Sequence, residues 1–373
     1  MDNTVVIFSL LNWESKLLHR AHMLAKYFHL KDHKVYHIQK ENISGVKELA
    51  FRPKYYEDKG ITIISLPALP YMKGKSKSIY DFNDWIMTKQ LKDVFSKLNQ
   101  PLILLESPYW IKAVNRSRDR KGILCYDISD DLIQFATNNK WKKLLAVYEK
   151  ETVDQADFIF VTSEILRKKA EHKERVFLVE NGIALEEFEN AGDVLGSNYN
   201  RPLCGFIGGL FQWVDFDLID KLAVHLPDYS FVLIGPTDKS EQIDELCKKP
   251  NIYYLGEKDK SVIGDYFASL DVGLIPFVSE EQYPRLKTVN SNKVFQYCYF
   301  GYPVISTKFE QVNGLQDIIE VCDGHEEFIS VLERIKINDS PEQREKRRKF
   351  AYDNSWAKRV DDIINIVNIH KKS

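Results

Sequence analysis

The strongest constraint on the fold is a repeated alternation between short apolar runs and helical patterns. The first run, Val5–Leu11, is followed after a polar break by apolar residues at helical spacing from Leu17 to Phe28. Strands that alternate with helices predict crossover connections and a parallel sheet. We therefore expect residues 1–190 to form one doubly wound α/β domain. Its further strands are expected at Val35–Ile38, Ile61–Leu66, Leu102–Leu105, Ile123–Tyr126 and Phe158–Thr162.

A second series of the same kind follows Glu189–Arg201, a polar stretch with turn composition and no periodicity. We interpret this stretch as the interdomain linker and residues 202–354 as a second doubly wound domain. Two domains also suit 373 residues, since a domain holds roughly 150 residues. Strands of the second domain are expected at Leu203–Ile207, Phe231–Ile234, Tyr253–Gly256, Val272–Ile275 and Val304–Ile305.

Composition narrows the class of protein. With 44% hydrophobic and 28% charged residues the chain is globular, and its formal charge of −2 provides no general field for binding nucleic acid. No apolar stretch is long enough to span a membrane and no signal peptide is visible at the N-terminus, so we expect a cytoplasmic protein. The five scattered cysteines are expected to be reduced and mostly buried, and no ligand cluster predicts a metal site.

Two segments of the second half can carry chemistry. Gly208 and Gly209 follow a predicted strand and precede a helix, where backbone N–H groups and the helix N-terminus can bind a phosphate. A tight turn is the alternative. Further on, the long polar loop Val278–Asn292 leads into a short helix with Lys293 and Gln296 on one face, suited to a phosphate and to a sugar hydroxyl. We expect the active site in the cleft between the two domains, at the carboxyl ends of their strands.

The order of these segments resembles GT-B-fold glycosyltransferases, in particular the large retaining group that uses nucleotide sugars and includes polysaccharide and teichuronic acid biosynthesis enzymes. The likeness extends over most of the chain, although no single motif is diagnostic. It rests on Ser163-Glu164, Asn181-Gly182, Gly205–Gly209, Phe231–Pro236, Leu255-Gly256, Asp271–Phe277 and Lys293–Ser306, with Trp13, Arg20 and Tyr126–Asp131 in the first half.

The resemblance implies a GT-B fold in which a terminal helix within 355–373 crosses back to the N-terminal domain. It implies donor binding without a cofactor or metal ion, a catalytic role for Asp127 and Lys293, and acceptor binding by Trp13, Arg20, Asp130 and Asp131. The donor site would comprise Gly208, Gly209, Gly235, Pro236, Leu255, Gly256, Phe277, Thr288, Asn292, Lys293 and Gln296.

Two departures from the family pattern concern the donor site. The group usually has two glutamates eight positions apart, where this chain has Thr288 and Gln296. It also commonly has Arg and Lys just after the glycine loop, where this chain has Gln212, Trp213 and Asp215. Either Lys293, helped by Arg285 or Lys287, provides the whole positive charge, or donor binding is weak or lost.

Several residues of the acceptor side have two interpretations. Asp127, Asp130 and Asp131 follow a predicted strand, so they can bind hydroxyls or act as a base, but either Asp130 or Asp131 can instead cap the next helix. His22 is as compatible with packing as with function. We expect His225 and His325 to be structural or exposed.

The leading hypothesis is therefore a glycosyltransferase that moves a sugar from a UDP- or GDP-sugar to a glycan or polyprenyl-linked acceptor. A GT-B-fold sugar-nucleotide epimerase and a non-catalytic glycan- or partner-binding protein are the alternatives. The basic stretches Arg116–Lys121 and Lys73–Lys77 suggest peripheral contact with the inner face of the cell membrane, and solvated loops are the alternative.

Overall fold

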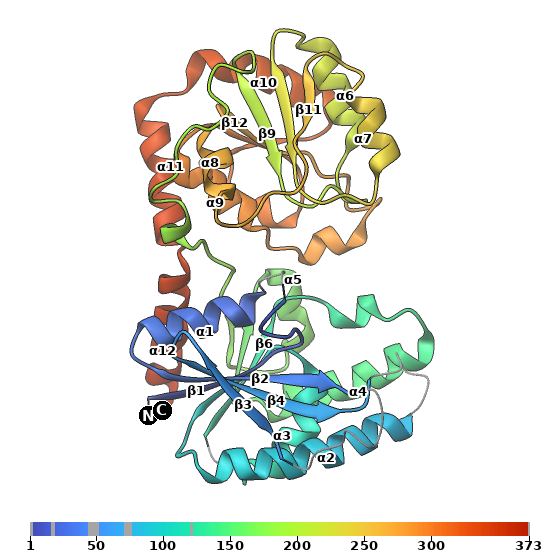
Figure 1. The fold of residues 1–373 in the computed structure, drawn as a ribbon, viewed down its shortest axis with the longest axis vertical. Coiled ribbons are helices and arrows are strands. Elements are labelled where there is room, and N and C mark those ends of the chain that lie inside the picture. Colours follow the sequence, from blue (N-terminus) through green and yellow to red (C-terminus); the bar gives the residue numbers. More distant parts are fainter. Residues whose placement is uncertain (1–2, 16–18, 44–51, 71–76, 120–121, 372–373) are drawn as a thin grey trace. The chain divides into compact units, whose positions relative to one another are not determined.

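The chain folds into two compact units, each built on one sheet. The computed structural model describes residues 3–15, 19–43, 52–70, 77–119 and 122–371. Unit 1 comprises Met1–Glu180 and Val360–Ser373, and unit 2 comprises Asn181–Arg359 (Figure 1). The predicted architecture of two doubly wound α/β domains is confirmed.

The sheet of unit 1 has the strand order β3-β4-β2-β1-β5-β6-β7-β8. All neighbouring strands are parallel except β3 and β4, which form an antiparallel hairpin. The sequence predictions missed the two edge strands β3 and β8. Strand β3 is mostly polar, and β8 is apolar but only three residues long. The strands are β1 Thr4–Phe8, β2 Lys34–Asn42, β3 Lys54–Asp58, β4 Ile61–Ala68, β5 Leu102–Leu105, β6 Ile123–Ile128, β7 Phe158–Val161 and β8 Val176–Leu178.

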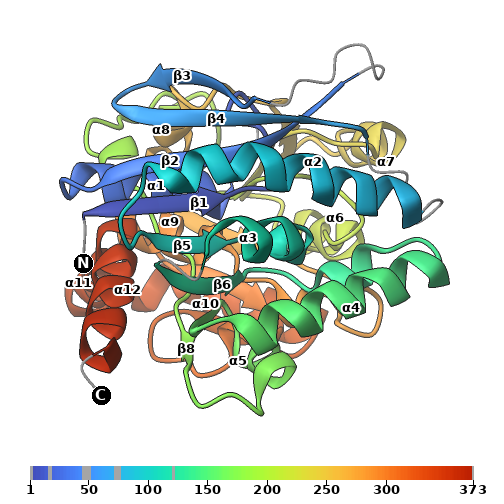
Figure 2. The same cartoon turned by 90° about the horizontal axis from the view of Figure 1, so that it is seen from below.

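Helices cover both faces of this sheet. Helix α1, Arg20–Leu30, packs on β1, β2 and β4. Figure 2 shows α2, α3 and α4 side by side over the other face, with α3 between its two neighbours. These three helices are Lys77–Ser96, Ile111–Ser117 and Asn139–Gln155, and the short α5 is Glu164–Arg167.

The sheet of unit 2 is entirely parallel and has the order β11-β10-β9-β12-β13-β14. Numbered from β9, this order is that of the dinucleotide-binding sheet, whose direction of strand addition reverses between its first and fourth strands. Here those strands are β9 and β12. The strands are β9 Leu203–Ile207, β10 Ser230–Ile234, β11 Ile252–Tyr254, β12 Val272–Ile275, β13 Val304–Thr307 and β14 Glu320–Cys322.

Two groups of helices surround this second sheet. Helices α6 and α10 contact each other, as do α6 and α7, whereas α9 contacts both α8 and α11. Between the sheet and these helices lies one continuous hydrophobic core. These helices are α6 Phe216–His225, α7 Ser240–Leu246, α8 Ile263–Ala268, α9 Asn292–Phe300, α10 His325–Asn338 and α11 Pro341–Asp353, and the last helix of the chain is α12 Trp356–Lys371.

The stretch that we interpreted as a linker belongs to unit 2. The units divide after Glu180, and residues 181–201 are part of the second unit. Within the stretch Leu195 is buried, and the N–H groups of Val194 and Leu195 both donate to the hydroxyl of Ser269. Backbone N–H groups of this segment thus donate to side chains rather than to a strand or a helix, which is compatible with its loop composition.

Helix α12 begins in unit 2, and its residues from Val360 onward group with unit 1. Lys31, directly after α1, forms an ion pair of 2.7 Å with Asp361, and the His370 ring lies 5.0 Å from that of Phe177. The end of the chain is thus tied to the N-terminal unit. Within the described ranges, no helix combines the length and apolarity needed to span a bilayer.

Candidate functional site

A pocket of about 420 Å³ lies in unit 2 where β9 and β10 end. Ile207 and Ile234, the last residues of these strands, line it together with the first residues of α9. Its position next to β9 is that of a ligand site in a doubly wound sheet, at the carboxyl ends of the strands. The polar lining consists of Glu257, Lys258, Asn290, Ser291, Asn292, Lys293 and Gln296.

Lys293 is half-buried in this pocket and lies directly against the glycine loop. A Cβ placed on Gly208 would overlap the Cε and Nζ atoms of Lys293. The ammonium lies 5.3 Å from the centre of the Phe206 ring, and it has no acidic partner among the described residues. Burial lowers the pKa of Lys293 to about 8. The side chain is therefore a cation in a poorly solvated position, where an anionic ligand would be its natural partner.

Two anchors hold α9 in this position. Ser291 caps the helix by accepting from the N–H of Lys293, and Gln311 exchanges two hydrogen bonds with the backbone of Ser291. The hydroxyl of Tyr297 accepts from the Ile207 N–H at 2.9 Å and donates to the Gly205 carbonyl at 3.2 Å. Because Tyr297 is one turn beyond Lys293, this pair of bonds fixes the lysine at the end of β9 and directs the helix N-terminus, with its partial positive charge, at the pocket.

The glycine loop, Gly208 and Gly209, continues from the end of β9, and backbone hydrogen bonds on either side of Gly209 join it to the segment at the end of β10. The N–H of Gly208 donates to the Ile234 carbonyl and that of Leu210 donates to the Pro236 carbonyl, both at 2.8 Å. Neither amide is available to a ligand, whereas the Gly209 N–H has no hydrogen-bond partner in the described part of the chain. Gly235 is required by packing, because a Cβ there would overlap the Gly208 carbonyl.

The predicted donor residues fall into two groups. Six of them line the pocket: Gly208, Gly235, Pro236, Asn292, Lys293 and Gln296. The other five do not line it: Gly209, Leu255, Gly256, Phe277 and Thr288.

The last two of that second group have structural contacts. Phe277 is buried against Phe206 and Phe309, and the hydroxyl of Thr288 donates to the Arg285 carbonyl. Arg285 and Lys287 do not line the pocket, whereas Lys258, which the sequence analysis passed over, does. The sequence could have indicated Lys258, because it lies two positions after the expected strand Tyr253–Gly256 and ligands bind at the carboxyl ends of such strands.

Asp215, in the region where the family commonly has basic residues, has a structural role. Its carboxylate caps α6 by accepting from the Leu218 N–H at 2.9 Å, and its second oxygen lies 2.8 Å from His325 Nε2. His325 thus has a structural contact, as expected, and His225 bonds to the Lys221 carbonyl. The positive charge at the pocket comes from Lys293, Lys258 and the N-terminus of α9.

In unit 1, the carboxyl ends of β5 and β6 carry buried acids. Arg20 Nε lies 3.0 and 2.8 Å from the two oxygens of Asp127, and Arg20 Nη1 donates to the Glu180 carbonyl. Two predicted site residues therefore bind each other in a buried ion pair, and a role for Asp127 as a base would require this pair to separate.

The sequence analysis did not identify a second buried acid, Glu106, which lies directly after β5. It accepts from Ser9 and Leu10 through Oε2, while its Oε1 is buried without a hydrogen-bond partner. Burial raises the pKa of Glu106.

Trp13 packs into a cluster with two histidines. Its ring is stacked 5.3 Å from that of His22 and lies 4.9 Å from that of His37, and its indole N–H donates to Asp58. Both histidines are buried, and burial lowers the pKa of His37 to about 3. Of the two interpretations of His22, the structure favours packing.

Asp131 is the residue that caps the next helical turn, by accepting from the Ile133 N–H, and it also pairs with Lys169 at 2.8 Å. Asp130 is half-exposed beside it. In the described ranges no group of three or more His, Cys, Asp or Glu side chains is placed to hold a metal ion.

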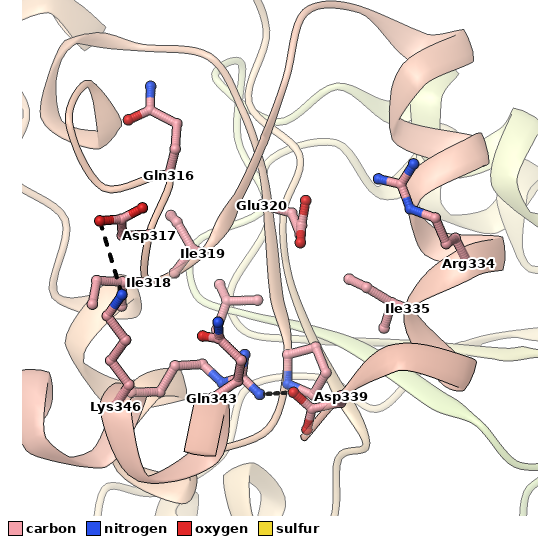
Figure 3. Close-up of a pocket in the computed structure, with 13 residues that line it drawn as sticks. Gln316, Asp317, Ile318, Ile319, Glu320, Arg334, Ile335, Asp339, Gln343 and Lys346 are labelled. Atoms are coloured by element: carbon pink, nitrogen blue, oxygen red, sulfur yellow. Dashed lines mark hydrogen bonds and ion pairs between the residues drawn. The ribbon is translucent and has the colours of Figure 1, made fainter. Parts of the chain in front are cut away.

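A second pocket of unit 2, of about 250 Å³, lies at the opposite edge of the same sheet, where β13 and β14 begin. Four of its charged side chains pair with one another. Lys346 points toward Asp317 in Figure 3 and lies 3.9 Å from it, and the buried Arg347 pairs with Asp339. None of the predicted site residues lines it. We therefore place the candidate site in the first pocket.

No family model matches the chain. It is 28% identical over 247 residues to TuaH of Bacillus subtilis (strain 168), a proposed teichuronic acid biosynthesis glycosyltransferase, and this match covers 62% of the chain. The chain spans about three fifths of that protein, with 61% of it covered.

Solved structures match over nearly the full length. Sucrose-phosphate synthase from Thermosynechococcus elongatus superposes with a TM-score of 0.72 at 13% identity, covering 99% of this chain and 100% of that one. HepE of Anabaena, solved with UDP and glucose, superposes with a TM-score of 0.66 at 13% identity, covering 98% and 99%. At this identity the likeness establishes architecture alone. The two sheets, parallel except for the β3–β4 hairpin, the helix shared by both units and these superpositions together show that the chain has the GT-B fold.

Proposed function

We propose that the protein is a glycosyltransferase that takes a sugar from a nucleotide diphosphate sugar and transfers it to a hydroxyl of a glycan or lipid-linked acceptor. The observation that carries the proposal is the position of Lys293, an ammonium without an acidic partner in the described chain, held at the N-terminus of α9 against Gly208. TuaH supports the reaction class and HepE, solved with UDP and glucose, supports the donor class.

The chemistry that this pocket offers is stabilisation of a diphosphate leaving group. Negative charge develops on the leaving group as the glycosidic bond breaks, and preformed donors that need not reorganise lower the barrier most. Lys293 and the partial positive charge at the N-terminus of α9 can provide this stabilisation. Gln296 can bond a sugar or ribose hydroxyl without adding charge.

A binding screen tests the donor class. We expect UDP or GDP, or one of their sugars, to raise the melting temperature of the wild-type protein, because a ligand that binds only the native state stabilises it. Titration calorimetry of the same ligand with Lys293→Gln should give roughly tenfold to hundredfold weaker binding, the cost of losing a charge-assisted hydrogen bond. Lys248→Gln, a change at an exposed lysine two residues beyond α7, is the matched control.

The alternatives predict different results. If no nucleotide or nucleotide sugar binds at millimolar concentration, the proposal fails. Nucleotide binding without turnover in the presence of acceptors would favour the non-catalytic protein, and conversion of the donor sugar without any acceptor would favour the epimerase. Turnover in the presence of EDTA is expected from the family resemblance, and loss of turnover there would contradict the metal-independent mechanism.

A further inference from the structure

The first half of α4 concentrates positive charge on a protein that is otherwise nearly neutral. Lys140, Lys142 and Lys143 are all exposed, and no acidic residue occurs between Asn138 and Tyr148. In the described chain none of the three forms an ion pair. Lysines on a solvated helix are usually interleaved with acids that neutralise them, so this segment differs from an ordinary helix surface.

Apolar side chains are exposed among these lysines. Val147, one turn beyond Lys143, is 58% exposed, and Phe135, in the turn that precedes α4, is 42% exposed. Together with the three lysines they form what we call the α4 surface. Exposed apolar groups beside lysines are the composition of a helix that rests on a lipid bilayer, where the apolar groups enter the headgroup region and the ammonium groups meet the phosphates.

Hydrogen bonds anchor the helix of the α4 surface near Asn138 and at Tyr148. Asn138 caps the helix by accepting from the Trp141 N–H at 2.9 Å, and the Trp141 indole bonds to the Tyr109 hydroxyl. One turn later Tyr148 donates to Asp84 of α2 at 2.6 Å. A surface fixed at both ends loses little conformational entropy when it binds.

The neighbouring helix extends the positive charge. Figure 2 shows α3 beside α4 on the same face of the sheet. Its Arg116 is exposed, and Lys112 Nζ lies 4.3 Å from the centre of the Tyr148 ring. Nucleic acid would also be attracted by such charge, but the exposed apolar side chains of Val147 and Phe135 favour a bilayer.

We propose that the α4 surface of unit 1 is a contact surface for an anionic lipid bilayer. The five residues of the α4 surface lie outside both basic stretches of the sequence analysis, although Arg116 of the second stretch is on the neighbouring helix α3. Most of Lys73–Lys77, with Arg120 and Lys121, lies outside the described residues. The proposed contact would bring a lipid-linked acceptor near the protein, but it does not depend on the proposed transferase activity.

Vesicle flotation of the full-length protein tests this surface. We expect binding to vesicles that contain phosphatidylglycerol, little binding to pure phosphatidylcholine, and loss of binding at high salt because screening weakens the attraction. The triple change of Lys140, Lys142 and Lys143 to Gln should weaken binding at least roughly tenfold, given the usual contribution of each basic residue near an anionic surface.

The matched control removes three exposed lysines of unit 2, Lys248, Lys308 and Lys349, also by change to Gln. It lowers the net charge equally and should bind vesicles as the wild type does. Equal losses in the two triple variants would overturn the α4 surface as the contact, and absence of any lipid-dependent binding would overturn the proposal. Both variants should keep the wild-type melting temperature and nucleotide affinity, which separates this test from that of the proposed function.

Insertion of the apolar members is a second readout. In a Cys247→Ser background, which removes the exposed native thiol, an environment-sensitive dye on Val147→Cys should shift to the blue with phosphatidylglycerol vesicles. The same dye on Lys308→Cys should not shift. Binding without a shift at position 147 would mean that another surface touches the lipid.

Discussion

The charge of Lys293 should depend on pH in the mildly alkaline range. Burial lowers its pKa to about 8, and only the protonated form attracts a diphosphate. Nucleotide affinity should therefore be full below pH 8 and fall above it, by about tenfold per pH unit at the limit. Lys293→Arg should bind with a flat profile over the same range, since a guanidinium stays charged. Calorimetric titration of UDP into both proteins across this range measures the effect, and parallel profiles would exclude Lys293 as the titrating group.

Gly208 leaves room for that lysine. Its φ of +153° also lies in the region that favours glycine. Gly208→Ala should displace the ammonium and weaken nucleotide binding as much as Lys293→Gln does, and the double variant should be little worse than either, because both changes remove one interaction. Gly192→Ala, where a Cβ meets no atom within 4 Å, is the control. Additive losses in the double variant would mean that the two residues act separately.

At the scale of elements, α2 and α4 meet around a buried acid. Asp84 accepts from Tyr148, and burial raises the pKa of Asp84 from 3.8 to about 6. Between these values the folded protein keeps a proton that the unfolded chain has lost, so Asp84 makes stability fall as pH rises through this window. Above pH 6 the cost is about 2–3 kcal/mol.

Asp84→Asn should remove this cost. The variant should be more stable than the wild type at pH 7, by up to about 2 kcal/mol after allowance for a weaker bond to Tyr148, and equally stable near pH 4. Chemical denaturation of both proteins at the two pH values measures the difference. A difference that is independent of pH would show that Asp84 does not titrate in this window.

The same elements show what sequence patterns can predict. Strands β5, β9 and β12 coincide with the expected runs to the residue, because a parallel strand buried on both faces consists only of apolar residues. The pattern fails at the edges: β3 has the sequence Lys-Tyr-Tyr-Glu-Asp, and β14 is three residues long.

Individual partners are harder to predict still. The helical pattern around Arg347 reads as a solvated face, but the side chain is buried against Asp339 and the Gly301 carbonyl. Asp127 and Arg20 are 107 positions apart, and no local pattern reveals that they pair. Tertiary contacts decided both cases.

At the scale of the molecule, the proposed function assigns the donor to unit 2 and the acceptor to unit 1. If the pocket of unit 2 is the donor site, UDP alone should slow hydrogen exchange in β9, β10 and α9, because a bound ligand stabilises the native state locally as well as globally. Amides of β5 and β6, where Glu106 and Asp127 lie, should gain protection only when an acceptor is added with UDP. Exchange measured by mass spectrometry on the wild type and on Lys293→Gln separates the cases: the variant should show neither effect at the same UDP concentration. Protection by UDP confined to unit 1 would place the donor there and reverse the roles of the two sheets.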